Sequence, residues 1–187
     1  DMSSVIEEVA AQQSDLGVLF VSDLTESFIR RILDSLNLEF FGLARLRPHV
    51  FLRRGHPLAD CDSITPEGLR AFPCVVFTQR ESNLNYAEEA EVGTGADFNQ
   101  VVYINDRATA YNVIAHTDCV STGSGVLPEG YGDERLLSIP LCEQVGDMRL
   151  GYVKLRGIPL AEQGAQFVDI LKTVPYTHLT LPTIHPV

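Results

Sequence analysis

The sequence predicts an α/β fold with a mostly parallel sheet. Short, nearly unbroken apolar runs of strand length alternate along the chain with longer amphipathic runs, and polar or Gly- and Pro-containing segments separate them. The chain has 187 residues, of which 45% are hydrophobic. This is long enough to bury a core, either in one large domain or in two small lobes.

The first quarter of the chain shows the alternation clearly. Residues 3–13 carry apolar side chains at helical spacing, and the run LGVLFVS at 16–22 is typical of a buried strand. Residues 23–37 are amphipathic, which predicts a helix, with three competing N-caps: Asp23, Thr25 and Ser27. The inner stripe of this helix is expected to consist of Phe28, Ile29, Ile32, Leu33 and Leu36.

Residues 38–54 form a long extended segment, which we expect to break at Pro48. Thr65 and Pro66 together predict the start of a short helix, with Thr65 as N-cap and Pro66 at the first helical position. The remaining expected elements are strands at 73–79, 100–106, 118–123, 135–141 and 148–157, a short helix and loop at 81–99, and helices at 107–117 and 159–174.

The last helix is expected to face inward with Phe167, Ile170, Leu171 and Val174. Residues 176–187 have no charged side chain other than histidine and no helical pattern. We therefore expect them to form a disordered tail, and their composition suggests sequence that is not native to the protein.

Charge and composition restrict the partners. The formal net charge is −11, and no run of clustered bases offsets it, so these residues are not expected to bind nucleic acid directly. No apolar run approaches the ~20 residues of a membrane span. The N-terminus lacks the pattern of a secretory signal, and the four cysteines are widely spaced. Reduced thiols and a cytoplasmic location are therefore expected.

Two His/Cys pairs raise the question of catalysis or metal binding. His56 precedes Pro57 and lies near Cys61, but no second histidine stands at metal-ligand spacing, so we interpret His56 as a structural corner. His116 would end a helix while Cys119 begins a buried strand, away from any group that would activate a thiolate, which favours an inert core cysteine. No metal or cofactor is expected.

Two Gly-containing segments carry no catalytic signal. The segment around Ser124 does not satisfy the G-x-S-x-G pattern of a nucleophile elbow, and a turn is the simpler interpretation. GTGADF at 93–98 precedes a strand, whereas a phosphate-binding loop follows a strand and opens a helix.

Polar residues follow four successive predicted strands. In α/β sheets, ligands bind outside the carboxyl ends of the strands, so this recurrence favours a binding site over ordinary caps and turns. The candidate ligand-binding residues are Ser22, Asp23, Thr78, Gln79, Arg80, Asn105, Arg107, Thr122 and Gly123. Arg80 or Arg107 is expected to pair with a carboxylate of the ligand, although Asp23 and Asp106 could instead occupy these arginines.

Five segments in order resemble the effector-binding domain of LysR-type transcriptional regulators: SDLGVLF, GHPLAD, ITPEGLRAFPCVVF, HTDCVSTGSGVLPEG and PLAEQGAQFVDIL. The resemblance covers about residues 5–174. It implies a type-II periplasmic-binding-protein-like fold, in which two Rossmann-like lobes hinge around a cleft. Lobe one would comprise residues 1–46 and 155–175, and lobe two residues 47–154, with crossovers near Arg47 and Lys154.

The resemblance also implies a function. The chain would bind a small-molecule effector, with Thr78, Gln79, Asn105 and Arg107 among the contacts, and would signal to a winged helix-turn-helix domain that these residues do not include. The first two strands and first helix of lobe one would be missing as well, leaving an unpaired sheet edge. A homodimer is implied, with residues 107–117 as our candidate contact. The alternative is a transporter's solute-binding protein of the same fold; an enzyme is not expected.

Overall fold

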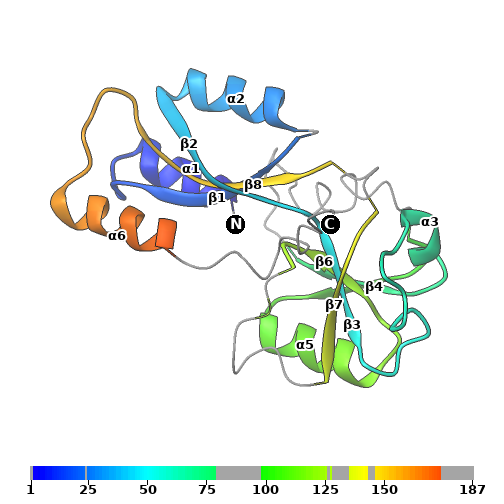
Figure 1. The fold of residues 1–187 in the computed structure, drawn as a ribbon. Helices are drawn as coiled ribbons and strands as arrows, with labels where there is room; N and C mark the ends of the chain where they lie inside the picture. The colour runs from blue at the N-terminus through cyan, green and yellow to red at the C-terminus, as the bar shows by residue number, and fades with distance from the viewer. Residues whose placement is uncertain are drawn as a thin grey trace, which may run out of the picture. The chain divides into compact units, whose positions relative to one another are not determined.

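The computed structural model describes residues 2–23, 25–78, 98–125, 127, 135–142 and 146–173 (Figure 1). The chain divides into two compact units, Asp1–Leu46 with Asp147–Val187, and Arg47–Gly146. The predicted helix and loop at 81–99 lie almost entirely outside the described residues, as does the tail at 176–187. Among the described residues, no helix is long and apolar enough to cross a membrane.

The chain crosses between the units twice, and the second of these two boundaries differs from the expected one. The chain leaves the second unit at Gly146, and not near Lys154. The reason is β8 (Met148–Leu155), which pairs along its length with β1 (Gly17–Ser22) and β2 (Leu38–Leu46). Because this strand completes the sheet of the first unit, it belongs there. The first boundary, between Leu46 and Arg47, coincides with the expected crossover.

The sheet of the first unit is antiparallel, with strand order β1-β8-β2. The expectation of a mostly parallel sheet is therefore wrong for this unit. The cause is that β8 returns from the second unit and inserts between β1 and β2, a pairing that local sequence patterns do not encode. Gly151 in β8 lies opposite Leu19 on one side and Gly42 on the other.

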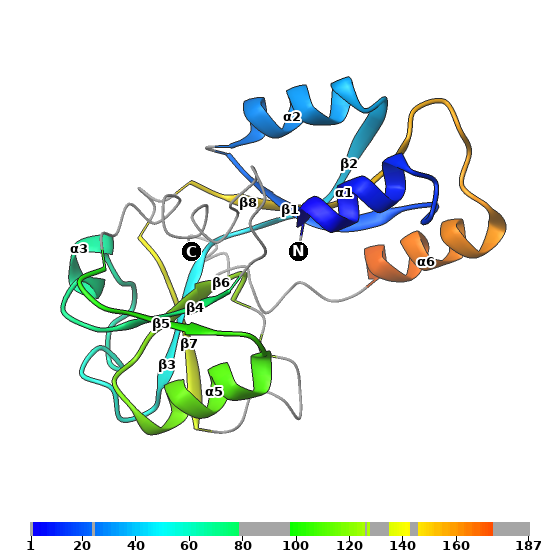
Figure 2. The same cartoon turned by 180° about the vertical axis from the view of Figure 1, so that it is seen from behind.

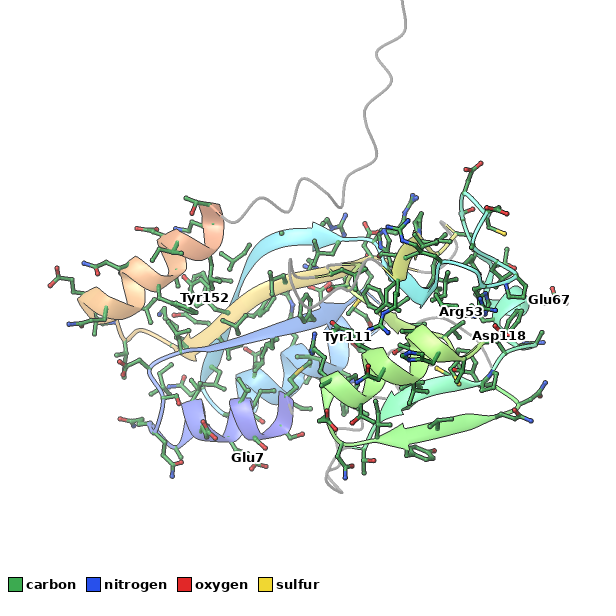
Figure 3. The ribbon with its side chains drawn as sticks, turned by 90° about the horizontal axis from the view of Figure 1, so that it is seen from below. Glu7, Arg53, Glu67, Tyr111, Asp118 and Tyr152 are labelled. Atoms are coloured by element: carbon green, nitrogen blue, oxygen red, sulfur yellow. The ribbon has the colours of Figure 1, made fainter. Side chains whose placement is uncertain are left out.

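Helices cover both faces of this sheet. The helices α1 (Met2–Ala10) and α2 (Glu26–Ser35) lie on one face and α6 (Glu162–Thr173) lies on the other (Figure 3). Residues Gly17, Leu19 and Val21 alternate as the buried positions of β1. The strand therefore shows the two-residue period of a sheet with one well-packed face.

The apolar stripes of two helices differ in part from those expected. In α2, Ile29 and Leu33 are buried, whereas Phe28 and Leu36 are exposed. In α6 the prediction that Phe167 and Ile170 face inward is wrong, since they are 44% and 62% exposed and Val168 is buried. Gly164, one turn before Val168, lies beside Leu16, and a Cβ at this position would make an ordinary contact of 3.5 Å with the Leu16 side chain.

The second unit contains a mixed set of strands (Figure 2). The strands β6 (Ser121–Gly123), β3 (His49–Arg53) and β7 (Leu136–Pro140) pair antiparallel in that order. The strands β4 (Cys74–Phe77) and β5 (Val101–Ile104) pair in parallel. A parallel bridge between Cys74 and Val120 sets β6 beside β4 with the same direction.

Two local predictions in this unit are confirmed. The extended segment breaks at Pro48, between β2 and β3. Thr65 caps α3 (Pro66–Leu69), with its hydroxyl accepting from Gly68 N at 3.2 Å. The longer helix α5 (Arg107–His116) packs against β3, β4 and β7, and buries Ala110 and Ile114.

Candidate functional site

His56 is a buried structural corner. Its Nδ1 accepts from Leu58 N at 3.1 Å, which leaves the proton on Nε2 to donate to Asp118 O at 3.2 Å. The ring packs at 4.4 Å between centroids against Phe72. With both nitrogens engaged by the backbone, His56 has neither a free base nor a free ligand atom, while Cys61 is exposed in the following loop.

The buried histidines predict a pH dependence. Burial lowers the pKa of both His49 and His56 below the ordinary value of 6.5. The unfolded chain therefore takes up protons first as the pH falls. The stabilisation from the neutral rings is complete above about pH 6.5 and is lost as the pH falls through the lower pKa values of the folded state.

We expect the urea midpoint of unfolding to decrease from pH 7.5 to pH 5.5, measured by far-UV circular dichroism. The double variant His49→Phe with His56→Phe should show a shallower decrease over the same range. An unchanged slope in the double variant would contradict this assignment.

The carboxyl ends of β4, β5 and β6 meet at one edge of the second unit. Thr78 follows β4 and donates its backbone N–H to Ile104 O, the last residue of β5, at 2.7 Å. Asn105 and the start of α5 follow at once. Because β6 runs parallel to β4, Thr122 reaches the same edge. The structure thus brings together four of the candidate residues: Thr78, Asn105, Arg107 and Thr122.

These four side chains are polar and have no bonding partner among the described residues. In the part of the chain that the structure describes, none of them makes a side-chain hydrogen bond or an ion pair. Their neighbour Asp106, by contrast, is hydrogen-bonded. As the N-cap of α5, its carboxylate accepts hydrogen bonds from Thr109 N at 2.9 Å and from the Thr109 hydroxyl at 2.6 Å. The Thr109 hydroxyl, followed by the backbone N–H groups, lowers the pKa of Asp106.

Gly123 has a packing role. A Cβ at this position would lie 2.7 Å from the ring of Phe51, so the strand needs a residue without a side chain here. The candidate residues Gln79 and Arg80 lie outside the described residues.

Ser22 and Asp23 belong to the first unit, where their side chains already contact other polar or charged side chains. The Ser22 hydroxyl lies 3.0 Å from that of Thr25. Asp23 lies 3.4 Å from the Arg45 guanidinium and 3.7 Å from that of Arg149, which also pairs with Glu26. Asp23 therefore faces these two arginines. Sequence reasoning missed both, because Arg45 and Arg149 become neighbours only through the β2–β8 register.

The enzyme candidates gain no support from the geometry. Cys119 is buried within an apolar cluster of the second unit, and His116 contacts Asn112 O and Arg135. All four cysteines are free thiols. Among the described residues, no three His, Cys, Asp or Glu side chains gather as a metal site would require.

The comparisons with known proteins agree on one family. A family model described as the LysR substrate binding domain matches residues 1–175. A putative LysR family transcriptional regulator from Pseudomonas aeruginosa is 18% identical with a TM-score of 0.64, over 92% of this chain and 57% of that chain. This chain therefore spans little more than half the length of that regulator.

Two isolated domains match over more of their length. The Synechocystis PCC6803 CcmR regulatory domain in complex with 2-PG is 18% identical with a TM-score of 0.65, covering 91% of this chain and 78% of that chain. The effector binding domain of QuiR in complex with shikimate is 14% identical with a TM-score of 0.64, covering 95% and 79%. These similarities confirm the expected fold class. A comparison with curated proteins gave no significant match.

Proposed function

Because this chain belongs to the LysR substrate-binding domain family, we propose that it senses a small metabolite on behalf of a transcriptional regulator. The observation that carries the proposal is the edge of the second unit where Thr78, Asn105, Arg107 and Thr122 come together. Donors without partners at the carboxyl ends of strands are what a ligand site in an α/β domain requires. Two structural neighbours are complexes with small molecules, shikimate and 2-PG.

An acidic effector fits this edge. Arg107 is the first residue of α5, so its guanidinium lies where the helix N-terminus also favours negative charge. Arg107 has no ion-pair partner among the described residues, and the nearby Asp106 carboxylate is held by Thr109. A planar guanidinium matches a carboxylate with two parallel hydrogen bonds. We therefore propose a carboxylate-bearing metabolite as the effector.

Replacing Arg107 by alanine should weaken that binding about tenfold or more, because a charge-assisted pair is lost. A thermal-shift screen of small carboxylates would first find a binder, since a ligand that prefers the folded state raises the melting temperature. Calorimetry would then compare the wild type, Arg107→Ala and the control Arg70→Ala, which removes an exposed arginine elsewhere in the second unit. Equal affinities for all three proteins would reject the role of Arg107.

The remaining parts of the proposal concern the longer protein. DNA would be contacted by a winged helix-turn-helix domain outside these residues, which agrees with the acidic charge of this chain. The location would be cytoplasmic, and the role regulatory with no reaction performed. A homodimer would form through α5 and the adjacent β5, whose Tyr103 is 69% exposed on an apolar strand. No observation favours the alternative of a transporter's solute-binding protein.

A further inference from the structure

A cavity of about 190 Å³ lies in the first unit, where α2 runs beside β2 (Figure 1). Its apolar lining comes from β1, α2 and β2 and consists of Val21, Ile29, Leu33, Leu38 and Phe40. Its charged lining consists of Glu26, Arg30, Asp34, Glu39 and Arg156. We call this space the α2 cavity.

The Phe40 ring offers the α2 cavity an accessible aromatic surface. A Cβ at Gly151 would lie 2.5 Å from Cε2 of this ring, so the ring lies over the backbone of β8 at a position without a side chain. The ring is half-buried there and borders the cavity, whereas Ile29 and Leu38 are at most 1% exposed. A second ring could stack on Phe40 and would displace water from it.

Every charged side chain in the lining already has a partner of opposite charge. The ion pairs join Glu26 to Arg30, Asp34 to Arg156 and Glu39 to Lys154. Glu26 also pairs with Arg149 of β8. A charged ligand would give up water and find these groups already neutralised, and burial of an unpaired charge is costly. The α2 cavity therefore favours an uncharged ligand.

The edge of β2 adds backbone hydrogen-bonding groups to the cavity. In the described part of the chain, β8 is the strand neighbour of β2 on one side and no strand pairs with its other side. Arg156 N donates to Asn37 O at 2.9 Å, so Asn37 points toward β8. Because successive residues of a strand point to opposite sides, the N–H and C=O groups of Leu38 and Phe40 point away from β8. Leu38 O accepts from the Arg156 guanidinium at 3.3 Å, whereas both backbone groups of Phe40 are open to a ligand.

We propose that the α2 cavity binds a small uncharged aromatic carboxamide. Apolar cavities of about 150 Å³ accept a benzene ring, so the volume suits a single ring packed against Phe40. A carboxamide carries an acceptor and donors side by side, which match the N–H and C=O groups of Phe40. The site lies in the first unit and shares no residue with the proposed effector site, so it does not depend on the proposed function.

A nuclear magnetic resonance titration of the chain with benzamide at neutral pH tests the proposal. Benzamide should shift the methyl signals of Ile29 and Leu33 and the backbone amide signal of Phe40, and leave the amide signal of Asn105 unchanged. Benzoate has the same shape with a carboxylate in place of the carboxamide. It should bind the α2 cavity at least about tenfold more weakly, because its charge finds no free partner there. Shifts of Asn105 by benzoate would concern the proposed effector site, so the two proposals can fail separately.

Two matched variants test whether the ligand occupies the space beside Phe40. Phe40→Trp places a larger ring next to the cavity and should weaken benzamide binding about tenfold or more, because the added atoms fill the ligand's space. Phe41→Trp makes the same change on the opposite face of the sheet, where Phe41 stacks on Tyr152, and should bind as the wild type does. The chain has no tryptophan, so the indole emission of each variant reports the burial of the new ring.

Melting curves establish that each variant is folded, and Phe40→Leu provides a second measurement at the same position. It removes the ring without filling the cavity, so it should weaken binding less than Phe40→Trp does. Four results would each overturn the proposal: equal affinity of Phe40→Trp and Phe41→Trp, binding of benzoate in the cavity as tight as that of benzamide, no shifts with benzamide in the wild type, or shifts confined to the second unit.

Discussion

Replacing Gly151 by alanine is expected to destabilise the first unit by about 3 kcal/mol. Gly151 lies in the central strand of its sheet, with β1 on one side and β2 on the other. A Cβ there would stand 2.4 Å from the backbone oxygen of Phe41, and the ring of Phe40 is closer still. The ring could move, but the backbone oxygen belongs to the neighbouring strand. The sheet must therefore shift to accept a methyl group.

Gly42 provides a matched control because it lies directly opposite Gly151 in the same sheet. A Cβ at Gly42 would have no heavy atom within 4 Å. Gly42→Ala should therefore change stability by less than about 0.5 kcal/mol, or raise it slightly by restricting the unfolded chain. Urea unfolding measured by circular dichroism compares the two variants.

Hydrogen exchange would show where the sheet weakens. In Gly151→Ala, peptides from β1 and β2 should lose protection, while peptides from β3 and β7 should keep it. Equal stability of the two alanine variants would mean that the irregular register between Gly42 and Ala44 absorbs the methyl group.

Local patterns located most elements because they depend on neighbours in sequence. The break at Pro48 and the Thr65–Pro66 helix start need no knowledge of the rest of the chain, since ring geometry and a capping hydroxyl act within a few residues. Pairing between distant strands is different. Nothing in the sequence of β8 states that it inserts antiparallel between β1 and β2, and both the sheet direction and the second boundary depended on that insertion.

The residues of the candidate site also fall into two groups: those that local sequence could predict and those that depend on pairing between distant strands. Asn105 and Arg107 could be placed because a strand end and a helix start are adjacent in sequence. Arg45 and Arg149, which face Asp23, could not, because three different strands bring them together. Which face of a helix is buried also depends on contacts with residues that are distant in sequence. Amphipathic spacing alone favoured Phe167, whereas the tertiary structure buries the adjacent Val168 and leaves Phe167 exposed.

Replacing His56 by alanine is expected to destabilise the second unit by about 2 to 4 kcal/mol, because buried polar groups lose their partners and the ring's packing is lost. Leu58 N loses its acceptor and Asp118 O loses its donor. The side chain is 4% exposed and contacts Phe72, which packs against the apolar cluster around Val50 and Leu52. The turn at His56 is thereby tied to the core.

Two further variants separate the contributions of this residue. His56→Phe keeps a ring against Phe72 and removes both hydrogen bonds, so it should recover the packing part of the loss and retain the polar part. Cys61→Ser alters the exposed thiol of the adjacent loop and should change stability by less than about 0.5 kcal/mol. Urea midpoints at pH 7.5, where both buried histidines are neutral, give the comparison. If Cys61→Ser cost as much as His56→Ala, the two side chains would act as a pair, and the role of His56 as a corner would have to be abandoned.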